Sequence, residues 1–343
     1  MIWLTWRQFR AQSIAAGAFV VAFGVVLLVS GIKIAHAYSS AGVPGCHGAG
    51  ACANAATTFI DQLRGSSTEL IYYTGIVIVY LAPALMGMFW GAPLVARELE
   101  TGTFRLAWNQ SVSRTRWVVA KLGLIWLAAM ATAGLLSLVT GSWASPIFRA
   151  GQLAGSDSVS LDRLAPQLFG AQGIAPIGYA AFAFALGVAA GVFIRHTIPA
   201  MAVTLVGFGL VQLAWPSWVR PHLAPQLRQY LPITGANVNE LVVENNQFIV
   251  RRTIFKPGGW VVSNQTVNPA GRPFGGAPLQ ACVSGPQSAC NAAVNTLHLR
   301  TLISYVPARG FWELQWIEAG IFVVLAAALT AFCAWWIRNR QLT

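Results

Sequence analysis

Long apolar stretches alternate with short polar segments along the chain. A helix that crosses the roughly 30 Å hydrocarbon core of a bilayer needs about 20 mostly apolar residues, at about 1.5 Å per residue. Six stretches meet this requirement, and we place the spans at about 13–35, 69–96, 118–145, 173–194, 198–218 and 314–337. The pattern therefore predicts an all-α polytopic membrane protein with six transmembrane helices, in which residues 1–343 form a single transmembrane domain.

The N-terminus allows two interpretations. Residues 1–12 carry apolar side chains at helical spacing, which predicts an interfacial helix on the membrane surface before the first span. These side chains are Ile2, Trp6 and Phe9. Alternatively, Arg7 and Arg10, the apolar run and the small residues near 35–37 resemble a signal peptide with its cleavage site. Because this apolar run exceeds the usual 7–15 residues, we expect an uncleaved span.

The connections between the spans differ greatly in length. Only residues 195–199 interrupt the fourth and fifth spans, with Pro199 suited to a first helical turn and Thr197 to a cap. We therefore expect a tight hairpin there. A large outer loop, 219–313, precedes the last span, and its Gly, Pro, Asn and Gln content predicts an irregular surface segment with one helix near 237–246.

Composition agrees with this layout, and charge sets the orientation. The chain is 56% apolar and only 9% charged, whereas soluble proteins average about 25% charged residues. The net charge of +12 is typical of basic cytoplasmic loops, so we expect no nucleic-acid partner. With both termini inside, basic residues are about threefold denser in the inner segments than in the outer loops. The inner segments are 1–13, 96–121, 195–197 and 338–343.

Four of the five cysteines fall in predicted outer loops. Cysteines on an oxidising face of the membrane pair as disulfides. We expect the local pairs Cys46–Cys52 and Cys282–Cys290, because the alternative pairing links two different loops. A metal site at Cys46 and the histidine after it is disfavoured, since it lacks a clear fourth ligand and standard spacing. Cys333 lies within the last span, where we expect it to pack.

The loop at residues 97–116 predicts a compact helical elbow. Gly102 can end the second helix in a left-handed conformation, and Thr103 can cap a new short helix. Phe104 begins an apolar stripe on that helix. Such an elbow suits the docking of a cytoplasmic protein, although spacing alone equally allows an ordinary basic loop.

The elbow sequence resembles the coupling-helix region of the type-2 ATP-binding-cassette exporter permeases. The resemblance rests on Arg97-Glu98-x-Glu100-x-Gly102-Thr103, followed by Ser111-Val112-Ser113-Arg114 and Lys121. It extends to the N-terminal helix, the six spans and the long loop before the last one. The segment 311–320, Phe-Trp-Glu-Leu-Gln-Trp-Ile-Glu-Ala-Gly, is similar to that boundary in actinobacterial members.

This resemblance implies a permease subunit in a bacterial plasma membrane, with both termini cytoplasmic. Its partners would be a cytoplasmic ATP-binding-cassette ATPase, a second permease copy and the lipid bilayer. The family pattern places the ATPase contact at Arg97, Glu98, Glu100, Gly102, Thr103, Phe104, Ser111 and Arg114. The implied activity is outward movement of an amphipathic or hydrophobic substrate, driven by ATP and Mg that the ATPase binds.

The chain carries no motif for hydrolysing ATP itself. Its lysines, Lys33, Lys121 and Lys256, do not close the glycine-rich sequence that cradles phosphates. We therefore expect no cofactor in this chain and no enzymatic activity of its own. A proton- or sodium-coupled secondary transporter is disfavoured, because the deep parts of the spans lack charge. We place Lys33, Glu69 and Glu318 at the outer ends, within reach of the interface.

A polytopic membrane enzyme acting on a lipid-linked substrate is the remaining alternative. Its acid and base would come from outer-loop carboxylates, namely Asp157 with Asp162, or Glu240 with Glu244. Solvated loop charges explain these residues better. Two weaker signals concern helix packing: the pairs Gly87/Gly91 and Gly187/Gly191 allow close helix contact, and two prolines, at 83 and 93, are expected to bend the second helix.

Overall fold

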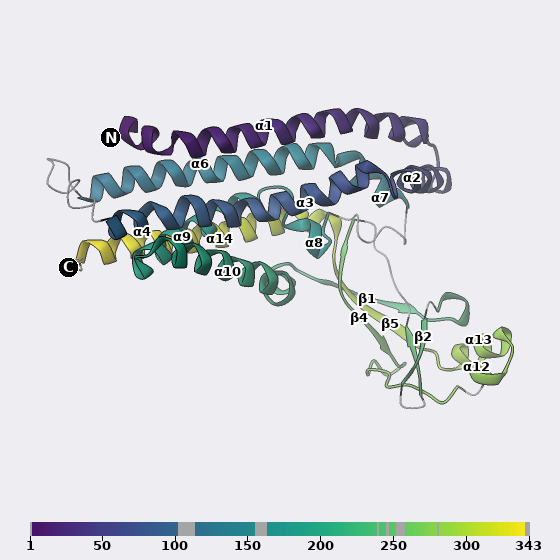
Figure 1. Cartoon of the computed structure of the whole chain (residues 1–343). Coiled ribbons are helices and arrows are strands. Elements are labelled where there is room, and N and C mark those ends of the chain that lie inside the picture. Colours follow the sequence, from purple (N-terminus) through teal and green to yellow (C-terminus); the bar gives the residue numbers. More distant parts are fainter. Residues whose placement is uncertain are drawn as a thin grey trace.

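The computed structural model describes residues 2–101, 114–154, 163–238, 240–244, 247–251, 258–279 and 281–339. Within these ranges, six helices are long and apolar enough to cross a membrane. The chain is mostly helical, and Figure 1 shows the long helices side by side in one elongated bundle. The prediction of an all-α polytopic membrane protein with six spans is therefore confirmed.

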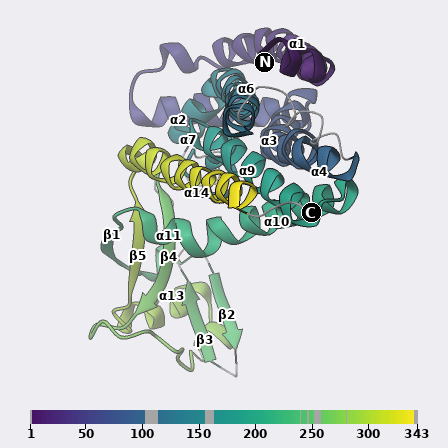
Figure 2. The ribbon, with the colours of Figure 1, turned by 90° about the vertical axis from the view of Figure 1, so that its left-hand side faces the viewer.

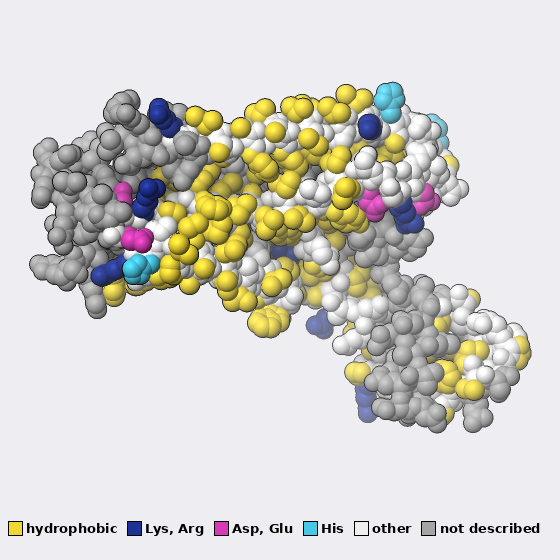
Figure 3. Space-filling model, in the orientation of Figure 1, with side chains coloured by type: hydrophobic (Ala, Val, Ile, Leu, Met, Phe, Trp, Pro, Cys, Tyr) yellow, Lys and Arg dark blue, Asp and Glu magenta, His cyan; other side chains and the backbone are white. Residues whose placement is uncertain are grey.

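The surface of the bundle agrees with this assignment. In Figure 3, hydrophobic side chains cover its middle, and charged side chains gather toward its two ends. We call the end that carries both chain termini the terminal end, and the opposite end the sheet end (Figure 1). Exposed apolar side chains along the length of a helix bundle are suited to lipid rather than water.

The first span is one helix, α1, from Ile2 to Ser40. Residues 2–12 belong to α1 and precede the apolar stretch Ile14–Ser40 that is suited to crossing the membrane, and the interfacial position of residues 1–12 stays a prediction. The sequence before Gly17 contains neither glycine nor proline, so nothing interrupts the helical hydrogen bonds. Near the sheet end, the indole N–H of Trp143 donates to the Ser30 hydroxyl at 3.0 Å and joins the third span to α1.

The second span consists of three consecutive helical pieces, α3 (Ser67–Met86), a π-helical turn η2 (Gly87–Gly91) and α4 (Ala92–Thr101). The π-helical turn lies between the two prolines that were expected to bend this helix. Such turns are rare and often lie at functional sites. The third span is α6 (Arg114–Trp143), which is followed at once by the short helix α7 (Ser145–Ala154).

Helix α9 (Ala175–Ile194) occupies the centre of the bundle, as the end-on view in Figure 2 shows. In the most apolar part of α9, 78% of the residues are buried. In the corresponding part of the fifth span, which begins with α10 (Thr197–Ala214), only 17% of the residues are buried. Arg195 adopts the left-handed conformation between the two helices (φ 60°). The expected tight hairpin is therefore present. The last span is α14 (Phe311–Asn339), which packs along α9.

The two disulfides form as expected. Cys46 pairs with Cys52 at the start of α2 (Ala49–Leu63), a helix in the first connection between spans. Cys282 pairs with Cys290 and joins α12 (Ala281–Ser284) to α13 (Gln287–Thr296). Cys333 is fully buried in the main hydrophobic core.

The long connection before α14 is a folded unit, so the expectation of an irregular loop is wrong. We call residues 227–306 the sheet domain. Strands β1 (Leu227–Pro232), β5 (Arg300–Val306) and β4 (Trp260–Val267) form an antiparallel sheet in the order β1-β5-β4. A separate core, which includes Ile233, Val250 and Leu299, lies inside this domain.

The expected helix near 237–246 is also wrong. The structure has β2 (Glu240–Glu244) paired antiparallel with β3 (Gln247–Arg251). The sequence contains the reason: two apolar runs, Leu-Val-Val at 241–243 and Phe-Ile-Val at 248–250, lie on either side of Asn245-Asn246. Runs rich in valine, isoleucine and phenylalanine favour strands, and asparagine favours turns.

Candidate functional site: the contacts of helix α9

The predicted coupling residues are only partly described by the structure. Arg97, Glu98 and Glu100 lie in the last turns of α4, at the terminal end of the bundle. Arg114 is the first residue of α6, and its side chain lies outside the described part of the structure. The remaining members of the predicted contact lie outside the described residues, and these are Gly102, Thr103, Phe104 and Ser111.

Glu100 connects the end of the second span to the α9–α10 hairpin. One carboxylate oxygen, Oε2, accepts hydrogen bonds from the Thr197 hydroxyl at 2.7 Å and from the Thr197 backbone N–H at 3.1 Å. The hydrogen bond from the Thr197 hydroxyl, followed by that from its N–H, lowers the pKa of Glu100. The other oxygen lies 3.9 Å from His196 Nδ1. Thr197 is thus the first residue of α10 rather than its cap, and a carboxylate from another helix satisfies the helix N-terminus.

Glycines bring α9 into backbone contact with the second span. A Cβ atom on Gly187 would overlap the carbonyl oxygen of Gly87 and lie 2.8 Å from the backbone nitrogen of Ala92. A Cβ on Gly91 would lie 2.5 Å from the Phe184 carbonyl oxygen, and one on Gly191 would lie 2.6 Å from that of Ala92. The two glycine pairs of the sequence therefore meet one another. Contacts of this kind let membrane helices approach closely and pack rigidly.

At the sheet end, Gln315 of α14 satisfies the first amides of α9. Its Oε1 accepts hydrogen bonds from the backbone N–H groups of Ile174 at 3.0 Å and Ala175 at 2.8 Å. Its Nε2 donates to the Phe169 carbonyl at 3.0 Å. The Gln315 side chain is fully buried. The N-cap residue of α9, Ile174, makes no side-chain hydrogen bond to the first turn of the helix. One turn later, Gly178 lies against the backbone of Ala319, which continues the contact between the two helices.

A buried ion pair lies one turn further along α14. Glu318 and Arg220 are both fully buried, with Arg220 Nε 2.9 Å from Glu318 Oε2. The expectation that Glu318 reaches the membrane interface is therefore wrong. Its carboxylate instead accepts hydrogen bonds from Arg220 and from the hydroxyl of Tyr179 on α9. The sequence reasoning missed Arg220 and Gln315. The available signal was a charge of each sign near the end of an apolar span.

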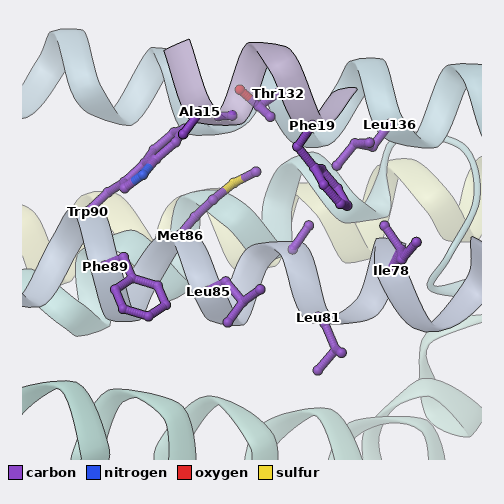
Figure 4. Close-up of a pocket in the computed structure, with 12 residues that line it drawn as sticks. Ala15, Phe19, Ile78, Leu81, Leu85, Met86, Phe89, Trp90, Thr132 and Leu136 are labelled. Atoms are coloured by element: carbon purple, nitrogen blue, oxygen red, sulfur yellow. The ribbon is translucent and has the colours of Figure 1, made fainter. Parts of the chain in front are cut away.

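An apolar groove lies on the opposite side of the second span, between α1, α3 with η2, and α6. Its volume is about 460 Å³, within the roughly 300–1,000 Å³ of small-molecule sites. Figure 4 shows Met86 and Trp90 on one side of Phe19 of α1, and Leu136 of α6 on its other side. The Thr132 hydroxyl already donates to the Ala128 carbonyl at 2.8 Å. The groove therefore offers apolar surface and no unsatisfied donor among its described side chains.

The carboxylates of the enzyme alternative do not form a described active site. Glu240 and Glu244 lie on one strand, β2, opposite Arg251 and Gln247 of β3. The other pair, Asp157 and Asp162, lies outside the described residues. Among the residues that the structure covers, no cluster of three or more His, Cys, Asp or Glu side chains could hold a metal ion.

Comparison with known proteins assigns the family. The family model described as ABC-2 membrane transporter related matches residues 17–220, more than half of the 343 residues. No curated protein and no solved structure matches the chain. The match runs from residue 17 within α1 to residue 220, and therefore includes the elbow region, both glycine pairs and Tyr179. This chain belongs to the ABC-2 membrane transporter related family and is a multi-pass membrane subunit of an ATP-binding-cassette transporter.

Proposed function

We propose that this chain is the permease subunit of an ATP-driven exporter in the bacterial plasma membrane, with both termini in the cytoplasm. The backbone contact of η2 and α4 with α9, through Gly91, Gly187 and Gly191, is the observation that carries this proposal. An exporter powered by a separate ATPase needs a stiff connection from its cytoplasmic elbow to the centre of the bundle. The second span, which leads into the elbow, makes this connection directly with the most buried helix.

The proposed movement follows from these contacts. The ATPase would bind the elbow at residues 97–116 and displace α4 along with it. Because glycine backbones leave no flexible side chain between α4 and α9, a displacement of α4 would move α9 too. Glu100 accepts two hydrogen bonds from Thr197, and these bonds would transmit the same movement to α10. A rigid contact with two discrete arrangements is what coupling between distant sites requires.

The proposed partners follow from what one chain supplies. ATP and Mg would be bound by the partner ATPase, since this sequence contains no phosphate-binding glycine loop. A second permease copy, identical or similar, would complete the translocation path. The substrate would be amphipathic or hydrophobic, because the groove lined by Phe19, Met86 and Trp90 is apolar and Phe19 is exposed on the surface of the bundle.

The test starts with the tagged chain purified from native membranes under mild conditions. We expect an ATP-binding-cassette ATPase to co-purify, and the reconstituted pair to export a fluorescent lipid from liposomes only with ATP. Replacing Glu98 and Glu100 by alanine should weaken the association. Replacing Glu313, an exposed carboxylate in the first turn of α14, is the matched control and should not. Transport by the isolated chain without nucleotide, or in response to a pH gradient alone, would overturn the proposal.

A further inference from the structure

Arg220 joins four segments of the molecule at one buried point. It is the first residue of α11 (Arg220–Leu223), which follows α10 through the π-helical turn η4 (Trp215–Val219). Its Nε and Nη2 atoms each donate to Glu318 of α14 at 2.9 Å, and Nη2 also donates to the Tyr179 hydroxyl of α9 at 3.2 Å. Its Nη1 donates to the Pro166 carbonyl of α8 (Pro166–Phe169) at 3.0 Å. The guanidinium also lies over the Phe169 ring, 4.6 Å from its centre.

This cluster lies where the sheet domain is attached to the bundle. The chain enters the sheet domain from α11 and leaves it through β5 into α14. Arg220 lies in α11, which precedes the sheet domain, and Glu318 lies in α14, which follows it. Their ion pair therefore joins the two helices that flank the domain. Figure 1 shows the sheet domain extending away from the bundle beyond this point. An apolar cluster that includes Leu164, Trp260 and Val306 packs the same base.

The geometry of the pair favours fixed orientation over added stability. A buried ion pair gains little net stability over apolar residues of the same volume, because desolvation offsets the attraction. A two-bond contact between guanidinium and carboxylate, however, fixes the relative orientation of the two planes. Tyr179 adds a third direction from α9, since its hydroxyl donates to Glu318 and accepts from Arg220. All three side chains are fully buried.

We infer that Arg220, Glu318 and Tyr179 are positioning residues that make the sheet domain move as one body with α9 and α14. The glycine contacts join α9 to the second span at one end, and this cluster joins α9 at the other end to α11 and α14, the two helices that flank the sheet domain. The inference rests on the proposed function where it concerns transport: displacement of the elbow would reach the sheet domain through α9. The part that concerns rigidity holds for the chain alone.

The first experiment measures rigidity in the isolated chain. Spin labels on cysteines introduced at Ser142, an exposed position of α6, and Ala270, at an exposed turn of the sheet domain, report the distance between bundle and domain. Four native cysteines are in disulfides and Cys333 is buried, so labelling should be selective. In nanodiscs we expect a narrow distance distribution for the parent chain. The double variant Arg220→Met with Glu318→Leu should broaden it clearly.

Two further variants keep this test decisive. Tyr179→Phe removes one hydroxyl and preserves packing, so it should fold and still broaden the distribution, to a smaller extent than the double variant. Arg228→Met with Glu313→Leu, which changes one exposed residue of each charge nearby, is the matched control and should leave the width unchanged. A distribution as narrow in the folded double variant as in the parent chain overturns the inference.

The second experiment measures coupling in liposomes that contain the ATPase partner. For the double variant we expect substrate moved per ATP hydrolysed to fall about tenfold, while ATP hydrolysis by the complex is maintained. Loss of folded protein would instead lower both rates together, and full coupling would overturn the inference. If the parent chain itself shows no ATP-dependent transport, the proposed function fails, and the spin-label distances still decide whether this cluster positions the sheet domain.

Discussion

The two ends of α9 are secured by different kinds of contact. Toward the terminal end, α9 meets the second span through glycines, and the close approaches there are to backbone atoms of the opposite helix. Toward the sheet end, it meets α14 and α11 through Gln315, Glu318 and Arg220, all fully buried and polar. One end depends on shape, and the other on charge and hydrogen-bond direction.

The difference shows how a single central helix can serve two mechanical roles. A backbone contact resists compression, so it transmits a push, but it tolerates no added volume. A polar contact holds a defined orientation, but it becomes costly as soon as one partner is removed. Substitutions at the two ends should therefore fail in different ways, and this can be measured.

The largest effect should come from breaking half of the ion pair. Glu318→Leu leaves the guanidinium of Arg220 buried without its carboxylate, which costs about 3–5 kcal/mol when a buried pair loses one partner. The double variant Arg220→Met with Glu318→Leu removes both charges and should unfold close to the parent temperature. Thermal unfolding in detergent micelles measures both. Equal destabilisation by the single and the double variant would show that packing, not charge, secures this end.

The next largest effect concerns the glycine end. In Gly187→Val the new side chain would collide with the backbone of Gly87 and Ala92, which cannot move aside as a side chain does. Overpacking of this kind costs about 1–3 kcal/mol, and we expect the upper part of that range. Gly209→Val on α10 is the matched control, because no heavy atom lies within 4 Å of its Cβ position. Similar yields of monodisperse protein from both variants would contradict the assigned contact.

A smaller and more local effect is expected for the cap of α9. Gln315→Leu leaves the N–H groups of Ile174 and Ala175 without their acceptor, at a cost of about 1–3 kcal/mol. Hydrogen exchange of these amides should accelerate, while exchange near Gly187 stays slow. Gln287→Leu, at an exposed position of α13, serves as the control. Unchanged exchange at Ile174 and Ala175 would mean that Gln315 does not cap the helix.

The sequence predicted the features that depend on neighbouring residues. Apolar length alone places six spans, and the two disulfides join cysteines six and eight positions apart. The pairing of β2 with β3 could also have been predicted from the two apolar runs around Asn245-Asn246. We expected a helix there instead, because the loop as a whole is rich in polar residues. Local patterns of this kind need no knowledge of the rest of the fold.

The features that sequence analysis missed depend on distant partners. Glu318 and Arg220 are 98 positions apart, so nothing in either segment shows that they bury one another. The glycine pairs were visible, but not that Gly87 faces Gly187 across the bundle. Glu100 was assigned to an ATPase contact, and the structure shows its carboxylate held within the chain by Thr197. Its contact with the ATPase, like that of the residues outside the described part, stays a prediction.

The smallest expected effect concerns Glu100, which tests whether the terminal end also uses a polar contact. Because the carboxylate is exposed, Glu100→Ala should leave the unfolding temperature unchanged. It should instead accelerate hydrogen exchange at the amide of Thr197, which loses its acceptor.

Acidification should reproduce this effect in the parent chain. The pKa of Glu100 is lowered by its hydrogen bonds from Thr197, so the contact is present above the ordinary carboxyl pKa and is lost as the pH falls through the lowered value. After correction for intrinsic exchange rates, exchange at Thr197 should rise at acid pH in the parent chain and in the control Glu313→Ala. In Glu100→Ala it should not depend on pH. If the alanine variant keeps the acid response, a titratable group other than Glu100 holds the hairpin, and the contact of Glu100 with Thr197 does not secure the terminal end.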